Sequence, residues 1–189
     1  MDSEKFEKLF TTEPVPLQEP HELAWLVNKV EKLKPLRIIV EVGIDKGGTL
    51  KFWDEIIEQK GLIIGIDINQ ALLFKPLHNH KYIFRDSTIP KTFEELIIYL
   101  DTNPIDFLHL DGCHEGAVFK DYAHFAPLVR KGGLIAMHDC GEPTSFYHKD
   151  ATSTRWTRGG APDVVKCFSE VKLEKEVLQY DQGTGVIYV

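Results

Sequence analysis

Short apolar runs alternate with amphipathic segments along most of the chain. The apolar runs are rich in Ile, Val and Leu and are bounded by glycine, proline or acidic residues, which is typical of buried strands. The runs predicted as strands are residues 37–42, 62–67, 81–85, 105–110 and 134–138. The segments predicted as helices are residues 21–33, 49–60, 91–100 and 116–129. Such alternation predicts an α/β protein with a Rossmann-like, doubly wound, mostly parallel sheet.

The C-terminal part of the chain has a different pattern. A polar stretch at 141–160 shows no clear periodicity and directly follows the fifth predicted strand. A helix is predicted at 162–170, and strands at 172–180 and 185–189 are joined by turn residues at 181–183. Because so short a turn joins antiparallel neighbours, the sequence predicts a seven-stranded sheet whose last strand is antiparallel.

Length and proline content suggest how the chain is organised. At 189 residues the chain is long enough for one domain with a sizeable core. The first twenty residues contain Pro14, Pro16 and Pro20 and are expected to form an irregular N-terminal arm. Residues 21–189 are then expected to form a single domain. Within it, residues 141–160 are expected to form a lid or substrate loop, or else an ordinary surface loop.

Charge and cysteine content exclude several classes of protein. A formal net charge of −7 argues against general binding to nucleic acid or to anionic membranes. The three cysteines, Cys113, Cys140 and Cys167, follow no CxxC spacing, so neither a disulfide framework nor a zinc ribbon is expected. The N-terminus is acidic, and no apolar run approaches the roughly 20 residues that cross a bilayer. These features predict a cytoplasmic protein.

A glycine-rich loop follows the first predicted strand. Gly43, Gly47 and Gly48 stand between this strand and a predicted helix, where missing Cβ atoms let the backbone approach a ligand. Asp45 occupies the position of a glycine in GxGxxG, so the loop is not a dinucleotide fingerprint. Glu41 at the strand end suits an ammonium group better than a pyrophosphate. Taken alone, the loop is equally consistent with a tight strand–helix turn.

Asp67 ends the second predicted strand, about twenty residues beyond the loop, where dinucleotide enzymes carry a ribose-binding acid. The alternative is a solvated acid or a helix N-cap. Together, the two features favour a nucleoside with a cationic amino-acid tail, a description that S-adenosylmethionine fits.

Several blocks of sequence carry a more specific resemblance. The blocks EVGIDKGGT, GIDIN, RDSTI, FLHLDGCHEG and APLVRKGGLIAMHD occur in this order between about residues 38 and 139. They resemble class I S-adenosylmethionine-dependent methyltransferases, in the group with cephalosporin hydroxylase-like and macrolide or rhamnosyl sugar O-methyltransferases. The resemblance implies that Asp67 binds the ribose and that Asp86 and Ser87 lie at the adenine edge. It implies that the remaining cofactor-binding residues are Glu41, Gly43, Gly47, Gly48, Thr49 and Asp111.

Four titratable residues follow two neighbouring predicted strands. Asp111 and His114 belong to DGCH, and His138 and Asp139 to MHDC. Two carboxylates with a histidine can bind a divalent cation. The resemblance implies that His114 is a general base and that Asp111 and Asp139 hold a metal, magnesium or manganese. Some relatives have glutamate in place of His138, so this histidine either points elsewhere or favours a softer metal such as manganese or iron.

Three other histidines are expected to be structural or solvated residues and not part of the active site. His109 lies within a strand and is expected to face a helix as a structural residue, whereas His78 and His80 flank a loop and are expected to be solvated.

The sequence thus predicts methyl transfer from S-adenosylmethionine to a hydroxylated small molecule, such as a sugar or glycosylated metabolite. The alternatives are a metal-dependent hydrolase or lyase that uses the Asp/His cluster, and a non-catalytic protein of the same fold. Proteins of the resembling group often assemble, so a homo-oligomer is consistent with the resemblance.

Overall fold

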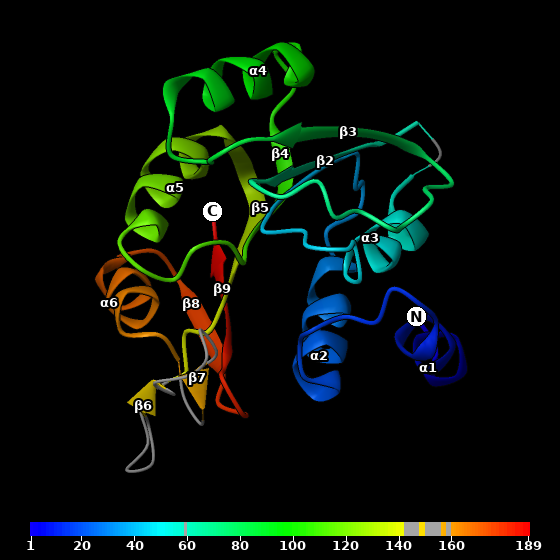
Figure 1. Ribbon diagram of the computed structural model, residues 1–189, viewed down its shortest axis with the longest axis horizontal. Coiled ribbons are helices and arrows are strands. Elements are labelled where there is room, and N and C mark those ends of the chain that lie inside the picture. The colour runs from blue at the N-terminus through cyan, green and yellow to red at the C-terminus, as the bar shows by residue number, and fades with distance from the viewer. Residues whose placement is uncertain (59, 142–147, 150–155, 158–159) are drawn as a thin grey trace.

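A computed structural model describes residues 1–58, 60–141, 148–149, 156–157 and 160–189. Its main element is a seven-stranded sheet with the strand order β3-β2-β1-β4-β5-β9-β8 (Figure 1). The strands of this sheet are β1 (Ile38–Val42), β2 (Leu62–Asp67), β3 (Asn79–Phe84), β4 (Ile105–Leu110), β5 (Val129–His138), β8 (Lys175–Leu178) and β9 (Thr184–Tyr188). The backbone of β6 (His148–Lys149) pairs with that of β7 (Trp156–Thr157) in a separate ribbon. Most of the predicted substrate loop at 141–160 lies outside the described residues.

The pairing of the strands confirms the predicted fold class. Strands β1 to β5 are parallel, whereas β9 runs antiparallel to both β5 and β8. β1 pairs with β2 on one side and β4 on the other, so the direction of winding reverses between β1 and β4. Ligands of such sheets bind beyond the carboxyl ends of the strands at this reversal.

Helices cover both faces of the sheet (Figure 1). They are α1 (Ser3–Thr11), α2 (Pro20–Val30), α3 (Leu50–Ile56), α4 (Pro90–Leu100), α5 (Ala117–Phe125), the short 3-10 helix η1 (Ala126–Leu128) and α6 (Pro162–Glu170). Helices α2 and α3 share one apolar core with Ile39, Ile63 and Phe107, and α1 packs against its edge. Helices α4, α5 and α6 share a second core with Val40 and Val42. Successive side chains of β1 therefore point alternately into the two cores, as expected for a strand that is buried on both faces. None of the described helices has the length and apolar character needed to span a membrane.

Two predictions of local structure were wrong. The N-terminal arm contains helix α1, which Asp2 caps by accepting a hydrogen bond from the Lys5 amide. The strand predicted at 134–138 begins earlier, at Val129, so Gly132 and Gly133 lie inside β5, where the register against β4 shifts between Ile105 and Phe107. The pair of glycines is thus absorbed as an irregularity within a longer strand.

His80 is not solvated, contrary to the prediction, whereas the His78 side chain remains partly exposed. His80 Nε2 lies 2.7 Å from Asp54 Oδ1, and both side chains are almost fully buried. The His78 and Leu77 amides also donate to the Asp54 carboxylate. Asp54 thereby fastens the loop before β3 to helix α3.

Candidate active site

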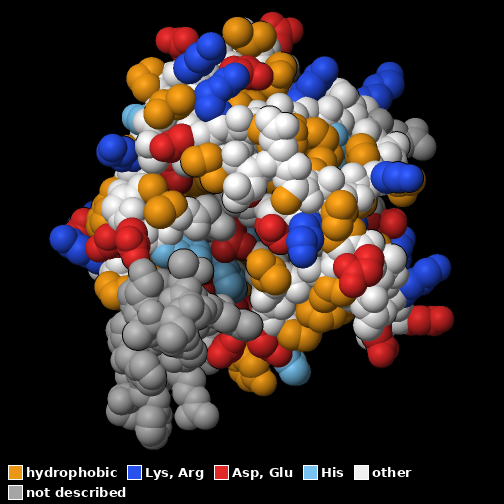
Figure 2. Space-filling view, viewed as in Figure 1, with side chains coloured by type: hydrophobic (Ala, Val, Ile, Leu, Met, Phe, Trp, Pro, Cys, Tyr) orange, Lys and Arg blue, Asp and Glu red, His pale blue; other side chains and the backbone are white. Residues whose placement is uncertain are grey.

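A cavity of about 980 Å³ opens at the carboxyl ends of the parallel strands. Its wall consists of the loops after β1, β2, β3, β4 and β5, together with arm residues 15–18. Histidine and acidic side chains gather at a hollow in the middle of this face (Figure 2). The candidate residues that line the cavity are Gly43, Gly48, Thr49, Asp67, Asp86, Ser87, Asp111, His114, His138 and Asp139. The predicted residues Glu41 and Gly47 are not part of the wall.

The glycine loop brings β1 into close contact with two other segments. Gly43 has φ +87°, and its amide donates to the Ile66 carbonyl at 2.8 Å. A Cβ on Gly43 would lie 2.1 Å from the Asp111 carbonyl oxygen, so only glycine fits between the ends of β1 and β4. A Cβ on Gly48 would lie 2.6 Å from Pro16 Cα, so this glycine admits the N-terminal arm.

Glu41 lies behind the cavity wall. Its buried carboxylate accepts hydrogen bonds from Thr49 Oγ1 at 2.6 Å and from Trp53 Nε1 at 2.7 Å. His109 Nδ1 lies 3.0 Å from the same carboxylate, and the His109 ring contacts Trp53 of α3 edge-on. The prediction that His109 faces a helix is confirmed. Glu41 reaches the cavity through Thr49, whose side chain it fixes.

Asp67 and Asp86, at the ends of β2 and β3, accept hydrogen bonds from residues of the adjoining loops. Asp67 at the end of β2 accepts the Asp45 and Asn69 amides, each at 2.8 Å. Each of its oxygens keeps a further lone pair for a ligand hydroxyl. Asp86 accepts the Thr88 amide and hydroxyl at 2.8 Å, and these two bonds lower the pKa of the Asp86 carboxyl.

Sequence reasoning missed a buried acid beside Ser87. Asp121 of α5 is 2% exposed, and its Oδ1 has no hydrogen-bond partner among the described residues. Burial raises the pKa of Asp121 to about 6, although Ser87 donates a hydrogen bond that opposes the shift.

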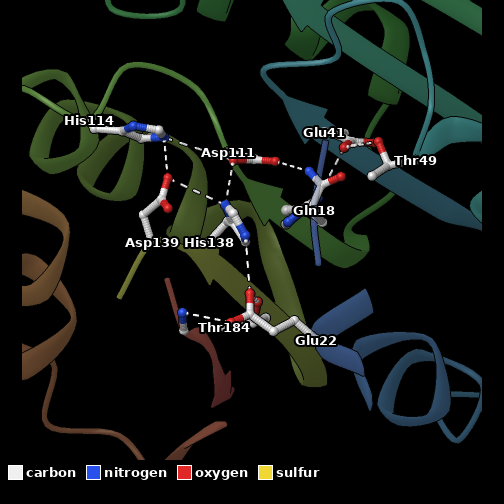
Figure 3. Close-up of polar contacts among 11 residues, drawn as sticks. Gln18, Glu22, Glu41, Thr49, Asp111, His114, His138, Asp139 and Thr184 are labelled. Atoms are coloured by element: carbon white, nitrogen blue, oxygen red, sulfur yellow. Dashed lines mark hydrogen bonds and ion pairs between the residues drawn. The ribbon is translucent and has the colours of Figure 1, made fainter. Parts of the chain in front are cut away.

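Two aspartates and two histidines meet at the ends of β4 and β5, as the sequence predicts (Figure 3). His138 Nδ1 lies 3.3 Å from both Asp111 Oδ1 and Asp139 Oδ2. His114 Nε2 lies 2.8 Å from Asp139 Oδ2 and 3.9 Å from Asp111 Oδ1. Asp139 has φ +58°, so the backbone turns sharply where β5 ends. Donor atoms of Asp111, His138 and Asp139 all lie within 4.8 Å of one another, a spacing that suits a divalent cation.

Mutual attraction governs the charge of this cluster. Burial disfavours ionisation of all four groups, but opposite charges outweigh it. The pKa of Asp111 is held well below its usual range, and that of Asp139 is lowered to about 2. The pKa of His114 is raised to about 10, and that of His138 is raised well above its ordinary value.

Two further site residues come from the N-terminal part of the chain. Glu22 of α2 is fully buried and accepts the Gly183 amide at 2.8 Å and Thr184 Oγ1 at 3.2 Å. Its Oε2 also lies 3.3 Å from His138 Nε2. Gln18 donates through Nε2 to Asp111 Oδ2. A signal for Glu22 exists in the sequence, because it stands four residues before Leu26 on the apolar face of its helix. We find no such signal for Gln18.

Comparisons with known proteins agree with this geometry. Residues 40–140 match a family model described as a methyltransferase domain. Among solved structures, the chain is similar to the MycE methyltransferase of the mycinamycin biosynthetic pathway, in complex with Mg, SAH and mycinamycin VI (TM-score 0.66, 17% identity, 97% of this chain and 53% of that chain). It is also similar to a putative caffeoyl-CoA O-methyltransferase from Staphylococcus aureus (TM-score 0.68, 13% identity, 100% and 93%). A third similar structure is the O-methyltransferase TomG from Streptomyces achromogenes in complex with SAM (TM-score 0.64, 15% identity, 100% and 91%).

The chain spans about half the length of the MycE chain. A comparison with curated proteins gives no match. At these identities the structural similarity establishes the fold.

Proposed function

The chain belongs to the methyltransferase domain family, and we propose that it transfers the methyl group of S-adenosylmethionine to a hydroxyl oxygen of a small molecule, such as a sugar or glycosylated metabolite. One observation carries this proposal: a single cavity joins the glycine loop and Asp67 to a cluster of carboxylates and histidines. The SAM in the TomG complex, and the SAH and mycinamycin VI in the MycE complex, support the same chemistry. We further propose that residues 21–189 form the catalytic domain and that the arm, residues 1–20, completes its wall.

The wall offers a fitting group for each part of the cofactor. Gly43, Gly48 and Thr49 lie where backbone and hydroxyl groups can hold the methionine part. Asp67 has free lone pairs for the ribose hydroxyls, and Asp86 with Ser87 lies one strand further on, at the adenine edge. Gly47 and Glu41 act from behind, by forming the turn and by fixing Thr49.

His114 is the proposed general base. The sulfonium of S-adenosylmethionine already carries an activated methyl group, so the protein has to align the acceptor oxygen and remove its proton. His114 lines the cavity, and its buried Nε2 lies 2.8 Å from Asp139 Oδ2, where Asp139 can hold the imidazolium that forms. The same carboxylates raise the pKa of His114 to about 10, which keeps it protonated until their charge is offset.

The residues at this point fit a divalent metal. Asp111, His138 and Asp139 would hold it, and one nitrogen beside carboxylate oxygens suits manganese or iron better than magnesium. Such a cation supplies positive charge that offsets the carboxylates and polarises the acceptor hydroxyl.

Calorimetric titration with S-adenosylhomocysteine tests the proposal. We expect saturable binding of about one ligand per chain and a loss of about tenfold or more in affinity for Asp67→Ala, which removes the acceptor of two ribose hydrogen bonds. Absence of binding at millimolar ligand in a folded sample would overturn the methyltransferase assignment and favour a metal-dependent hydrolase at the same cluster.

A further inference from the structure

The segment that carries Gln18 is fastened to the glycine loop. Lys51 Nζ of α3 donates to the Thr12 carbonyl and, at 2.8 Å, to the Pro14 carbonyl. Pro16 packs directly against Gly48. These contacts place Gln18 in the cavity wall between the loop after β1 and Asp111 at the end of β4 (Figure 3).

The Asp111 carboxylate determines which way the Gln18 carboxamide faces. An ionised carboxylate only accepts hydrogen bonds, so the amide nitrogen of Gln18 has to face Asp111 Oδ2. Oε1 then points away from Asp111, toward the side of the cavity where Thr49 lies (Figure 3). This oxygen is buried and has no hydrogen-bond partner in the part of the chain that the structure describes. A buried amide oxygen without a donor is unfavourable, so this position favours a ligand that brings a donor.

The order of the strands indicates which part of the cofactor reaches Gln18. Asp67 ends β2 and Asp111 follows β4, with β1 between them. Neighbouring strands lie about 4.8 Å apart, so the two acids are separated by roughly 10 Å across the glycine loop. A nucleoside whose ribose lies at Asp67 therefore extends its amino-acid tail across Gly43 toward Asp111 and Gln18. Of the two charged groups on that tail, the ammonium donates hydrogen bonds, whereas Asp111 repels the carboxylate.

We propose that Gln18 is a cofactor-binding residue whose Oε1 accepts a hydrogen bond from the α-ammonium group of S-adenosylmethionine. The proposal rests on the proposed function. It assigns the N-terminal arm a specific task, the recognition of the cationic end of the cofactor. Gln18 and Asp111 then form one subsite. The Asp111 carboxylate attracts the positive charge of the ammonium group, and the Gln18 carboxamide orients that group through a hydrogen bond.

Two ligands isolate the ammonium contact. One is S-adenosylhomocysteine, and the other is its deaminated analogue, in which hydrogen replaces the α-amino group. Affinities for both are measured by calorimetry with the wild-type chain and with Gln18→Leu, which keeps the size of the side chain but removes its polar atoms. We expect Gln18→Leu to lose about tenfold or more in affinity for S-adenosylhomocysteine and less than about twofold for the analogue.

A neighbouring variant controls for displacement of the arm. Glu13 of the arm is exposed and is not part of the cavity wall, so Glu13→Gln should leave both affinities near those of the wild type. Equal losses on both ligands in Gln18→Leu, or no loss on either, would overturn the assignment of Gln18. If the wild-type chain binds neither ligand, the proposed function itself fails, and this outcome is distinct from the other two.

Discussion

Glu22 and His138 face each other inside the cavity wall, with Glu22 Oε2 3.3 Å from His138 Nε2 (Figure 3). The other ring nitrogen of His138 faces Asp111 and Asp139. The His138 imidazole thus lies between the Glu22 carboxylate of helix α2 and the two aspartate carboxylates of the candidate metal site. A histidine held in this way presents Nδ1 to a cation while Nε2–H faces a carboxylate, an arrangement that strengthens metal ligation.

Glu22→Gln should therefore weaken metal binding. Glutamine keeps an acceptor for the Gly183 amide but removes the charge that faces His138. We expect Mn²⁺ affinity to fall by about 10- to 100-fold, measured by calorimetry or by electron paramagnetic resonance of free Mn²⁺. The matched control is Asp106→Asn, which changes a buried carboxylate that accepts two backbone amides outside the cavity wall. An affinity as high as that of the control would contradict this role of Glu22.

His114→Ala should abolish the removal of a proton but not the binding of cofactor. We expect kcat on an acceptor substrate to fall by about 10²- to 10⁴-fold while the affinity for S-adenosylhomocysteine changes by less than about twofold. Cys113→Ala alters the adjacent cavity residue and should retain turnover close to that of the wild type. Normal turnover by His114→Ala would show that another group removes the proton.

Gly43→Ala tests the contact between β1 and β4. Its Cβ would lie 2.1 Å from the Asp111 carbonyl oxygen at a φ of +87°. We expect urea unfolding to show a loss of more than about 2 kcal/mol in the free energy of unfolding. Gly116→Ala is the control, because Gly116 also has a positive φ but nothing within 4 Å of the added carbon. That variant should lose about 1 kcal/mol from backbone strain alone, and equal losses in the two variants would contradict the steric argument.

Asp121→Asn should stabilise the protein increasingly as the pH rises from about 4 to 6, with the full effect above pH 6. The raised pKa of Asp121, about 6, means that the folded chain binds this proton more tightly than the unfolded chain does. The wild type therefore loses stability as the pH rises from about 4 to 6, whereas the asparagine variant does not. At pH 7.5 we expect the variant to be more stable by about 2–3 kcal/mol, with the difference shrinking near pH 4.

Chemical denaturation at both pH values measures the effect of Asp121→Asn. Glu94→Gln changes an exposed acid of α4 and should show no comparable pH-dependent difference. A constant difference between Asp121→Asn and the wild type at both pH values would contradict the prediction.

The regular elements could be predicted because local patterning decides them. The strands at 62–67 and 105–110 and the helix at 162–170 match the structure residue for residue. Alternation also explains Glu41, which shares the Ile39 side of β1 and so faces Trp53 of α3 instead of the cavity. The sequence predicts an acidic residue at the end of this strand. Which group its side chain contacts depends on where α3 packs, and the sequence alone does not show that.

Gln18 and Glu22, which the sequence analysis missed, both contact residues that lie far away in the sequence. Gln18 meets Asp111 across 93 positions, and Glu22 meets Gly183 across 161. No local pattern reports such contacts, because they depend on where whole elements come to lie. The burial of His80 beside Asp54 was missed for the same reason. His80 was predicted to be solvated because the sequence does not show that α3, which carries Asp54, packs against this segment.

The long separation between Glu22 and its partners Gly183 and Thr184 has a consequence for biosynthesis. During translation, α2 leaves the ribosome long before β9 exists, and until then the Glu22 carboxylate lacks the donors that hold it. The wall that fixes His138 closes only when β9 has paired with β5. Synthesis of the C-terminal hairpin is therefore the step that completes the surroundings of His138 in the proposed metal site.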